Sequence, residues 1–360
     1  MIDLTLHTVF ENSLEHSVHK VAKCIKNNVD SCTAYIEGTN LKDIRNGEIL
    51  AKLENKISDM DEYEIWIVYP DAHKISRFFR PSSNSNTILL TERCDQRCIM
   101  CSQPPRNLDY AHFELYKEAI RQIDHKCIIG ISGGEPTLFK KELIRFIDEC
   151  SIANDNVTFH VLTNAQHFET SDIQSITSLR NNIIWAVPIY SNEVDCHDRI
   201  VGKQGAFRQL MRGLAILARA SANVEIRTVI LRENVYHITR LANFIGKNLP
   251  WINTWSLMQL EKKGFAVIDW DNKFFDTSED FHMVEKSIEI SCIRKFNLEL
   301  FNFPRCTVPP QFRKYTRKSI SDWKRKYLTA CNVCSEKELC GGVFEWYDDD
   351  IGYNNILAIQ

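Results

Sequence analysis

The chain of 360 residues has little net charge and no long apolar run. Its 44 Lys and Arg residues nearly balance its 47 Asp and Glu residues, which leaves a formal net charge of −3. Such a balance gives no overall field that would attract nucleic acid or an anionic lipid surface. No stretch approaches the roughly 18–20 consecutive apolar residues that cross a bilayer. We therefore expect neither nucleic acid nor a membrane among the partners.

Signals for export and low-complexity tracts are also missing. The first residues, Met1-Ile2-Asp3-Leu4, lack the basic region and the apolar stretch of a signal peptide, so the expected compartment is the cytoplasm. Hydrophobic residues make up 44% of the chain and charged residues 25%, which is ordinary for a globular protein with a large core. The length favours a core of about 200 residues with smaller flanking domains.

The hydrophobic pattern divides the chain into three expected domains. Residues 1–84 have mixed patterning, with a β-hairpin predicted for strands 64–69 and 75–79, and we expect a small N-terminal α/β domain. Residues 85–264 alternate between short β-branched runs and helical patterns. Residues 265–360 form a C-terminal extension rich in charge, aromatic residues and cysteine, with one helix near 280–296.

The alternation in residues 85–264 predicts a parallel sheet with right-handed crossovers. Because the stretch is shorter than the roughly 200–250 residues of a closed eight-unit barrel, we expect an open partial (β/α)6 barrel of the TIM type. The predicted strands are 87–93, 127–132, 156–163, 183–190, 223–231 and 252–260, and the predicted helices are 109–123, 140–152, 205–220 and 235–247.

The 13 cysteines separate into scattered and clustered ones. The scattered ones, which we interpret as small buried hydrophobes, are Cys24, Cys32, Cys127, Cys150, Cys196 and Cys292. Clusters of thiols in a reducing compartment indicate a metal. The two clusters are Cys94/Cys98/Cys101 and Cys306/Cys331/Cys334/Cys340.

The first cluster is a C-x3-C-x2-C array directly after the first barrel strand. Three thiolates can hold three irons of a [4Fe–4S] cubane and leave the fourth iron open, whereas electron-transfer clusters use four cysteines. Structural zinc is the alternative, but it favours a closed set of four ligands. Loops that follow barrel strands form the active-site face, so this loop is the candidate metal site.

Polar residues also occur where later barrel strands end. The second strand runs into Gly133-Gly134-Glu135-Pro136, in which the glycines permit close backbone approach and Glu135 can accept a bond from an ammonium. Each of these polar segments also has a purely structural interpretation. In that interpretation Gly133-Gly134-Glu135-Pro136 is a simple turn, Ser191 and Asp198 cap helices, and Arg227 forms a surface ion pair. We interpret His197 as a loop-ordering residue. The third, fourth and fifth strands contribute Thr163 and Asn164, Ser191, and Arg227 respectively.

Together these motifs resemble the radical S-adenosylmethionine (SAM) superfamily. The resemblance implies that SAM chelates the open iron, that an external flavodoxin or ferredoxin supplies an electron, and that reductive cleavage of SAM gives a 5′-deoxyadenosyl radical. It also implies that Cys94, Cys98 and Cys101 ligate the cluster. Met100 replaces the aromatic residue that is usual beside the adenine. The implied SAM contacts are Met100, Gly133, Gly134, Glu135, Pro136, Thr163, Asn164, Ser191 and Arg227.

The second cluster predicts another metal site. Cys306, Cys331, Cys334 and Cys340 form a set of four thiols in a region too small for a large core. Either an Fe–S cluster or structural zinc suits four thiolates. The C-x2-C-x5-C-G pattern is similar to part of the SPASM or twitch extensions of peptide-modifying radical SAM enzymes. It lacks the seven cysteines of a full SPASM set, so the resemblance implies one auxiliary [4Fe–4S] cluster.

Residues 89–106, 303–306 and 320–324 resemble the HxsC-type radical SAM maturases of the His-Xaa-Ser system, with Asp95 where Asn is expected. The similarity runs from about residue 64 to 345. This resemblance implies that the chain modifies a small ribosomally made peptide or protein, beside a second radical SAM protein. The first alternative is a radical SAM enzyme that acts on a small molecule or nucleoside. The second is a non-enzymatic Fe–S redox sensor or electron carrier.

The stretch 313–326 carries seven basic residues and only one acidic residue, Asp322. One interpretation is a solvated helical face, and the other is a basic surface that recruits an acidic segment of a peptide substrate. The basic residues are Arg313, Lys314, Arg317, Lys318, Lys324, Arg325 and Lys326.

Overall fold

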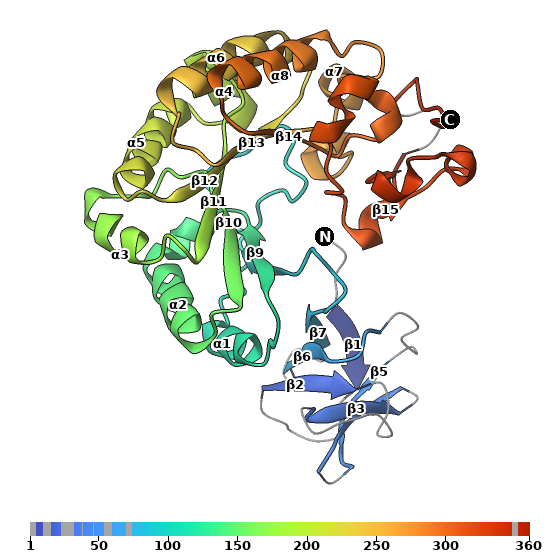
Figure 1. Ribbon diagram of the computed structural model, residues 1–360. Coiled ribbons are helices and arrows are strands. Elements are labelled where there is room, and N and C mark those ends of the chain that lie inside the picture. The colour runs from blue at the N-terminus through green and yellow to red at the C-terminus, as the bar shows by residue number, and fades with distance from the viewer. Residues whose placement is uncertain are drawn as a thin grey trace. The chain divides into compact units, whose positions relative to one another are not determined.

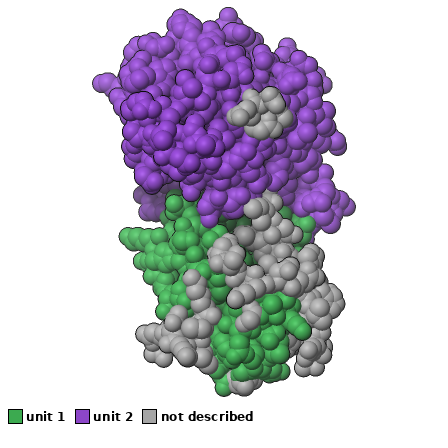
Figure 2. Space-filling view, turned by 90° about the vertical axis from the view of Figure 1, so that its right-hand side faces the viewer, with its two compact units in different colours: residues 1–90, 110–131, 141–159 green, residues 91–109, 132–140, 160–360 purple. Residues whose placement is uncertain are grey.

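The computed structural model divides the chain into two compact units, coloured separately in Figure 2. Unit 1 comprises residues 1–90, 110–131 and 141–159, and unit 2 comprises residues 91–109, 132–140 and 160–360. Neither unit coincides with one of the three expected domains, so that division stays a prediction. The structure describes residues 5–9, 16–22, 32–37, 39–45, 47–53, 60–69, 74–347 and 352–360.

The N-terminal part of unit 1 is a closed β-barrel with the strand order β1-β5-β4-β3-β2-β6-β7. The predicted hairpin is confirmed, because β6 and β7 pair antiparallel, while its turn at 70–73 lies outside the described residues. No helix occurs in the described residues before Thr87, so the expected α/β character is wrong for them. The strands are β1 Thr5–Val9, β2 Ser17–Ala22, β3 Ala34–Glu37, β4 Asn40–Asp43, β5 Ile49–Leu53, β6 Glu64–Tyr69 and β7 Lys74–Phe79.

A buried ion pair accompanies the apolar core of this barrel. The Glu64 carboxylate accepts hydrogen bonds from Arg77 Nε at 2.9 Å and from Trp66 Nε1 at 2.6 Å. A buried charge is tolerated when such partners replace its hydration. Around it, Leu41, Trp66 and Ile75 belong to the set of fully buried apolar side chains.

The second sheet has the strand order β14-β13-β12-β11-β10-β9-β8, and the pairs from β11 to β14 are parallel. All six predicted barrel strands are present. The sheet also has a seventh strand, β14, which lies beyond the expected domain boundary at residue 264. This strand was not predicted from the sequence because it is only four residues long. The strands are β8 Thr87–Thr91, β9 Cys127–Gly133, β10 Val157–Leu162, β11 Ile183–Pro188, β12 Asn223–Val229, β13 Thr254–Met258 and β14 Leu298–Phe301.

Helices alternate with these strands, as Figure 1 shows. The four helices predicted in the barrel and the one near 280–296 are confirmed, whereas α3, α4 and α7 were not predicted. No helix in the described residues is long and apolar enough to cross a membrane. The helices are α1 Phe113–Arg121, α2 Lys140–Ala153, α3 Ile173–Ser178, α4 Val194–Val201, α5 Ala206–Arg219, α6 Ile238–Asn248, α7 Trp270–Lys273 and α8 His282–Arg294.

In unit 2 the helices α5, α6 and α8 cover the outer face of the sheet (Figure 1). Helix α5 buries Phe207, Leu210, Leu214 and Leu217, which recur with the helical period and form one apolar face. After β14 the chain forms short 3₁₀ helices and the two-stranded sheet of β15 (Arg325–Lys326) and β16 (Val343–Phe344). This last part of unit 2 carries the second cysteine cluster.

We predict that Gly213→Ala destabilises the protein although it lies inside α5. A Gly-to-Ala change in a helix ordinarily stabilises it by about 1 kcal/mol. Here a Cβ would lie 1.7 Å from the backbone oxygen of Ala165, in the loop after β10. Overpacking against backbone should lower the free energy of unfolding by about 2 kcal/mol or more, as measured by urea denaturation.

Gly246→Ala in α6 is the matched control. Its Cβ would meet the side chains of Arg294 and Phe296 rather than backbone, so the loss should be smaller. A Gly213→Ala protein as stable as the wild type would contradict the close packing of α5 on this loop.

Candidate functional site

The loop of the first cysteine cluster lies entirely in unit 2, and the end of α4 fixes its backbone. Arg97 donates its N–H to Val201 O at 3.0 Å, and Ile99 donates to Ile200 O at 2.9 Å. These carbonyls belong to the last turn of α4, where no intrahelical donor remains for them. The loop therefore supplies the partners that the helix end needs.

Two glycines with positive φ bring later segments against this loop. Gly202 (φ +64°) ends α4, and a Cβ there would lie 2.8 Å from Arg97 O. Gly264 (φ +60°) begins a 3₁₀ helix, and its Cβ would lie 2.3 Å from Cys101 O. Phe265 donates its N–H to the same carbonyl at 2.8 Å. Only glycine suits both the left-handed conformation and the short distance.

The three thiols are partly buried. Burial raises the pKa of Cys94 to about 12, and it also raises the pKa of Cys98 and Cys101. The Cys98 thiol donates to Gln96 Oε1 at 3.5 Å, and the Cys101 thiol donates to Gln103 O at 2.9 Å. Metal coordination deprotonates a thiol outright, so ligation requires both thiols to leave these hydrogen bonds.

The donor set fits an iron–sulfur cluster in chemistry, and its side chains are not prearranged. Three thiolates on one loop match a cubane with one iron left free. However, no group of three or more His, Cys, Asp or Glu side chains within the described part of the chain is arranged to hold a metal ion. Ligation by Cys94, Cys98 and Cys101 therefore stays a prediction that rests on their chemistry and position.

The Gly133-Gly134 pair approaches the backbone that precedes Cys94. A Cβ on Gly133 (φ +141°) would lie 2.0 Å from Thr91 O, and one on Gly134 would lie 2.1 Å from Arg93 O. Gly134 donates its N–H to Thr91 O and Glu135 donates to Arg93 O, both at 2.8 Å. The sequence predicted close approach to a ligand, and the close approach found here is to the chain itself.

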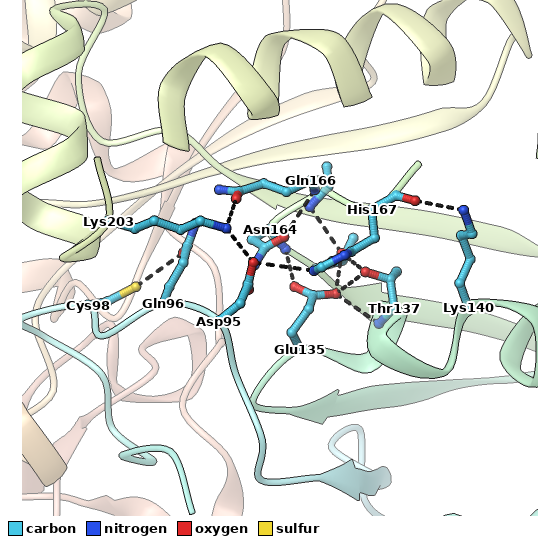
Figure 3. A network of polar contacts seen from close by, with 12 residues as sticks. Asp95, Gln96, Cys98, Glu135, Thr137, Lys140, Asn164, Gln166, His167 and Lys203 are labelled. Carbon is cyan, nitrogen blue, oxygen red and sulfur yellow. Dashed lines mark hydrogen bonds and ion pairs between the residues drawn. The ribbon is translucent and has the colours of Figure 1, made fainter. Parts of the chain in front are cut away.

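Glu135 is buried at the centre of a hydrogen-bond network, seen in Figure 3. Its Oε1 accepts from Thr137 N at 2.9 Å, Thr137 Oγ1 at 2.5 Å and Thr163 Oγ1 at 2.6 Å. Its Oε2 accepts from Asn164 N at 2.6 Å. Burial raises the pKa of Glu135, while these donors act in the opposite direction. The carboxylate thus links the segment after β9 to the segment after β10.

Asn164 connects this network to the cysteine loop. Its Nδ2 donates to Asp95 Oδ1 at 2.7 Å, and its Oδ1 accepts from Gln166 N at 3.0 Å. Thr163 and Asn164 are both buried. The structure therefore brings Glu135, Thr163 and Asn164 together beside Asp95, as expected for residues at neighbouring strand ends.

Ser191, Asp198 and His197 have local structural partners. Ser191 Oγ accepts from Glu193 N at 3.0 Å before α4, and Asp198 accepts from Gly205 N and Phe207 N at the start of α5. These are the capping roles that the sequence left open. The buried His197 accepts from Tyr190 N through Nδ1 at 3.3 Å, and burial lowers its pKa to about 4. A SAM contact for Ser191 stays a prediction.

Arg227 lies on β12 and is largely buried, so it is no surface ion pair. Its Nη1 lies 3.6 Å from Glu225 Oε1, its Nη2 donates to Met258 Sδ at 3.3 Å, and its guanidinium lies 5.9 Å from the centre of the Phe301 ring. A thioether and an aromatic face are weak partners for a cation. The guanidinium therefore keeps capacity to bind an anion.

The other two residues of the predicted SAM set are buried. Met100 packs in an apolar cluster with Tyr190, Ile200 and Val201. Pro136 begins the 3₁₀ helix Pro136–Phe139, whose N-terminal cap is Glu135. A direct SAM contact for either stays a prediction.

All four cysteines of the second cluster line one cavity in unit 2. Arg305 and Gly342 each direct a backbone N–H at Cys340 Sγ, at 3.4 Å. Such N–H groups stabilise a thiolate, as they do around Fe–S clusters. Burial raises the pKa of Cys306 to about 11, with Cys340 and Cys331 contributing. Residues 356–359 also line the cavity. The position of residues 356–359 beside the thiols was not predicted, because nothing in the sequence marks these residues as neighbours of the cysteines.

The basic stretch 313–326 is not a helical face. It contains the end of the 3₁₀ helix Pro310–Tyr315, the 3₁₀ helix Asp322–Lys324 and strand β15. Three of its charges are paired: Arg313 with Glu336 at 3.3 Å, Arg317 with Glu299 at 2.9 Å, and Lys324 with Glu261 at 2.9 Å. Recruitment of an acidic peptide stays a prediction. Because three of the seven basic side chains are paired within the chain, fewer positive charges are available for it than the sequence indicated.

Comparison with known protein families defines the class. Residues 88–245 match the model of the Radical SAM superfamily, and this match includes Cys94, Cys98, Cys101 and the segment 133–136. The superfamily that this part of the chain matches is the one that the sequence motifs predicted.

Particular relatives are more distant. A cysteine-type anaerobic sulfatase-maturating enzyme of Clostridium novyi is 26% identical over 140 residues, which is 37% of this chain and 37% of the relative. The match thus spans less than half of that protein. Streptococcus suis SuiB bound to its precursor peptide SuiA is 16% identical, with a TM-score of 0.48, over 59% of this chain and 48% of SuiB. The enzyme anSMEcpe with AdoMet and the Cp18Cys peptide is 13% identical, with a TM-score of 0.47, over 59% and 62%.

We predict that Thr163→Val destabilises the protein through Glu135. Valine keeps the shape but removes the hydroxyl that donates to Oε1 of this buried carboxylate. The expected loss is about 1.5–3 kcal/mol in the free energy of unfolding, measured by urea denaturation.

Thr177→Val is the control, because its hydroxyl donates to Ile173 O in the exposed part of α3. It should change stability by less than about 0.5 kcal/mol. Equal effects of the two substitutions would show that the Glu135 network does not carry this energy.

Proposed function

We propose that this chain is a radical SAM enzyme that reductively cleaves SAM and abstracts hydrogen from a peptide or small protein substrate. The observation that carries the proposal is the loop of Cys94, Cys98 and Cys101 in a segment that matches the superfamily, with Glu135 beside it. A bound [4Fe–4S] cluster with one open iron would supply the electron for cleavage and the site at which SAM is chelated.

The residues of the chain would bind and orient SAM. The Glu135 carboxylate has four protein donors, so its orientation is fixed before a ligand ammonium arrives. Arg227, whose one carboxylate partner is Glu225 at 3.6 Å and whose other partners are Met258 and Phe301, would take the SAM carboxylate with its remaining N–H groups. Met100 would provide an apolar surface for the adenine. Such preorganisation reduces the entropy lost on binding.

A peptide substrate is the finer part of the proposal. It rests on the resemblance of residues 89–106, 303–306 and 320–324 to HxsC-type maturases, and on the four-thiol cavity that would hold an auxiliary [4Fe–4S] cluster. The expected partners are a small substrate protein, a second radical SAM protein and an external flavodoxin or ferredoxin, in the cytoplasm. Coexpression with a neighbouring small open reading frame, followed by mass spectrometry of its product, tests the substrate class.

The two alternatives predict different results. A radical SAM enzyme for a small molecule or nucleoside would leave every coexpressed peptide at its unmodified mass while still producing 5′-deoxyadenosine. An Fe–S redox sensor or electron carrier would bind iron but would not turn over SAM. Having three cysteines in the first cluster instead of four favours the enzyme.

We predict that Cys98→Ala abolishes formation of 5′-deoxyadenosine from SAM in the reduced, anaerobic protein. It should also remove about four irons per chain, because one cubane loses a ligand. Cys292→Ala is the control, since this thiol is exposed and lies outside both clusters. Undiminished 5′-deoxyadenosine from Cys98→Ala would refute the assignment of the first cluster.

The second cluster gives a separate prediction. If Cys306, Cys331, Cys334 and Cys340 ligate an auxiliary cubane, the protein should contain about eight irons and little zinc, and Cys334→Ala should retain about four. Metal analysis of the wild type and this variant makes the comparison. About one zinc with four irons in the wild type would assign the cavity to structural zinc.

A further inference from the structure

Asp95, directly after Cys94, is the centre of a charged network that the resemblance does not assign. Lys203 donates to Asp95 Oδ2 at 2.5 Å and to Gln166 Oε1 at 2.7 Å. Asn164 donates to Asp95 Oδ1, and His167 Nε2 lies 3.4 Å from Oδ2 (Figure 3). The side chains of Asp95 and Lys203 are 23% and 25% exposed, so water screens their attraction only in part.

Lys203 belongs to the segment at the end of α4 that also forms main-chain hydrogen bonds with the cysteine loop. Lys203 directly follows Gly202. The two residues before Gly202 are Ile200 and Val201, whose carbonyl groups accept the N–H groups of Ile99 and Arg97 respectively. The backbone between Cys94 and Cys101 is therefore attached to this segment twice. One attachment is by main-chain hydrogen bonds at 97 and 99, and the other is by the Asp95–Lys203 ion pair.

These two attachments close a ring that contains Cys98 and begins one residue after Cys94. The loop contributes residues 95–99, and the end of α4 contributes residues 200–203. Gly202 cannot be replaced without a clash, because its Cβ would lie 2.8 Å from Arg97 O. Since the segment is fixed, the ammonium of Lys203 sets where Asp95 lies, and the adjacent Cys94 is set with it. An uncharged residue at 203 would leave the Asp95 carboxylate with weaker partners.

We propose that Lys203 is a positioning residue for the cluster-binding loop, acting through Asp95 on Cys94. This inference rests on the proposed function only in requiring that the three cysteines hold iron. Lys203 touches neither SAM nor the cluster in this account. Through its ion pair with Asp95, Lys203 orders the loop before the cluster is ligated and helps the loop to retain the cluster afterwards.

The test is the rate at which an iron chelator bleaches the reconstituted, anaerobic protein. The signal to follow is the electron paramagnetic resonance (EPR) spectrum of the reduced cluster that changes when SAM is added, because only a cluster with an open iron responds to SAM. Lys203→Met should lose this signal at least about tenfold faster than the wild type, since a charge-assisted bond is lost. Its SAM-bound spectrum should also be broadened by a heterogeneous loop.

Two variants separate positioning from general stability. Lys203→Arg keeps the charge and should restore most of the retention. Lys117→Met removes a lysine that is 13% exposed and paired with Glu149 in unit 1, so it should lower stability without altering the SAM-responsive signal. Equal bleaching of Lys203→Met and the wild type, or equal effects of Lys203→Met and Lys117→Met, would overturn the proposal. Failure of the proposed function would differ, because either the wild type would show no SAM-responsive signal or Cys98→Ala would keep that signal in full.

Discussion

Close backbone packing around the loop of Cys94, Cys98 and Cys101 is the constraint on which the rest of the site depends. Gly133 and Gly134 approach it from the end of β9, Gly202 from the end of α4, and Gly264 from the segment after β13, each at distances that exclude a Cβ. Because main-chain atoms fill these contacts, the loop has few ways to move. Polar side chains around the loop then have fixed neighbours. As a result, Glu135, Asn164 and Lys203 each form a hydrogen bond with a residue of another loop.

The same loop is joined to the second cysteine cluster by apolar packing inside unit 2. Met100, Ile200 and Trp270 belong to one buried cluster with Val343 and Tyr353, and partly buried Cys98 and Ile356 pack against it. Val343 and Ile356 also line the cavity of the four thiols. The aromatic rings of Trp270 and Trp346 lie 5.0 Å apart within this cluster. One continuous set of apolar side chains therefore packs against both cysteine clusters.

Much of this could be predicted from the sequence, and the failures have physical causes. The alternation of β-branched and helical patterns located six strands, and the spacing of Cys94, Cys98 and Cys101 predicted a metal site on the loop after the first of them. Strand β14 was missed because four residues carry too little periodicity. Apart from Thr137, the partners of Glu135 and Asp95 were missed because they come from residues 28 to 108 positions away along the chain. The roles of Gly202 and Gly264 were missed because a glycine shows in sequence only that φ is free, and the backbone opposite it appears only in the fold.

The central claim is that the three thiols of one loop leave a single iron open to SAM. Electron–nuclear double resonance on the reduced protein, with SAM labelled by ¹⁵N at its amino group and ¹⁷O at its carboxylate, tests this claim directly. The account predicts that both nuclei couple to the cluster, because amino nitrogen and carboxylate oxygen would be ligands of the open iron. An intact reduced cluster that shows coupling to neither nucleus, at SAM concentrations that saturate binding, would contradict it.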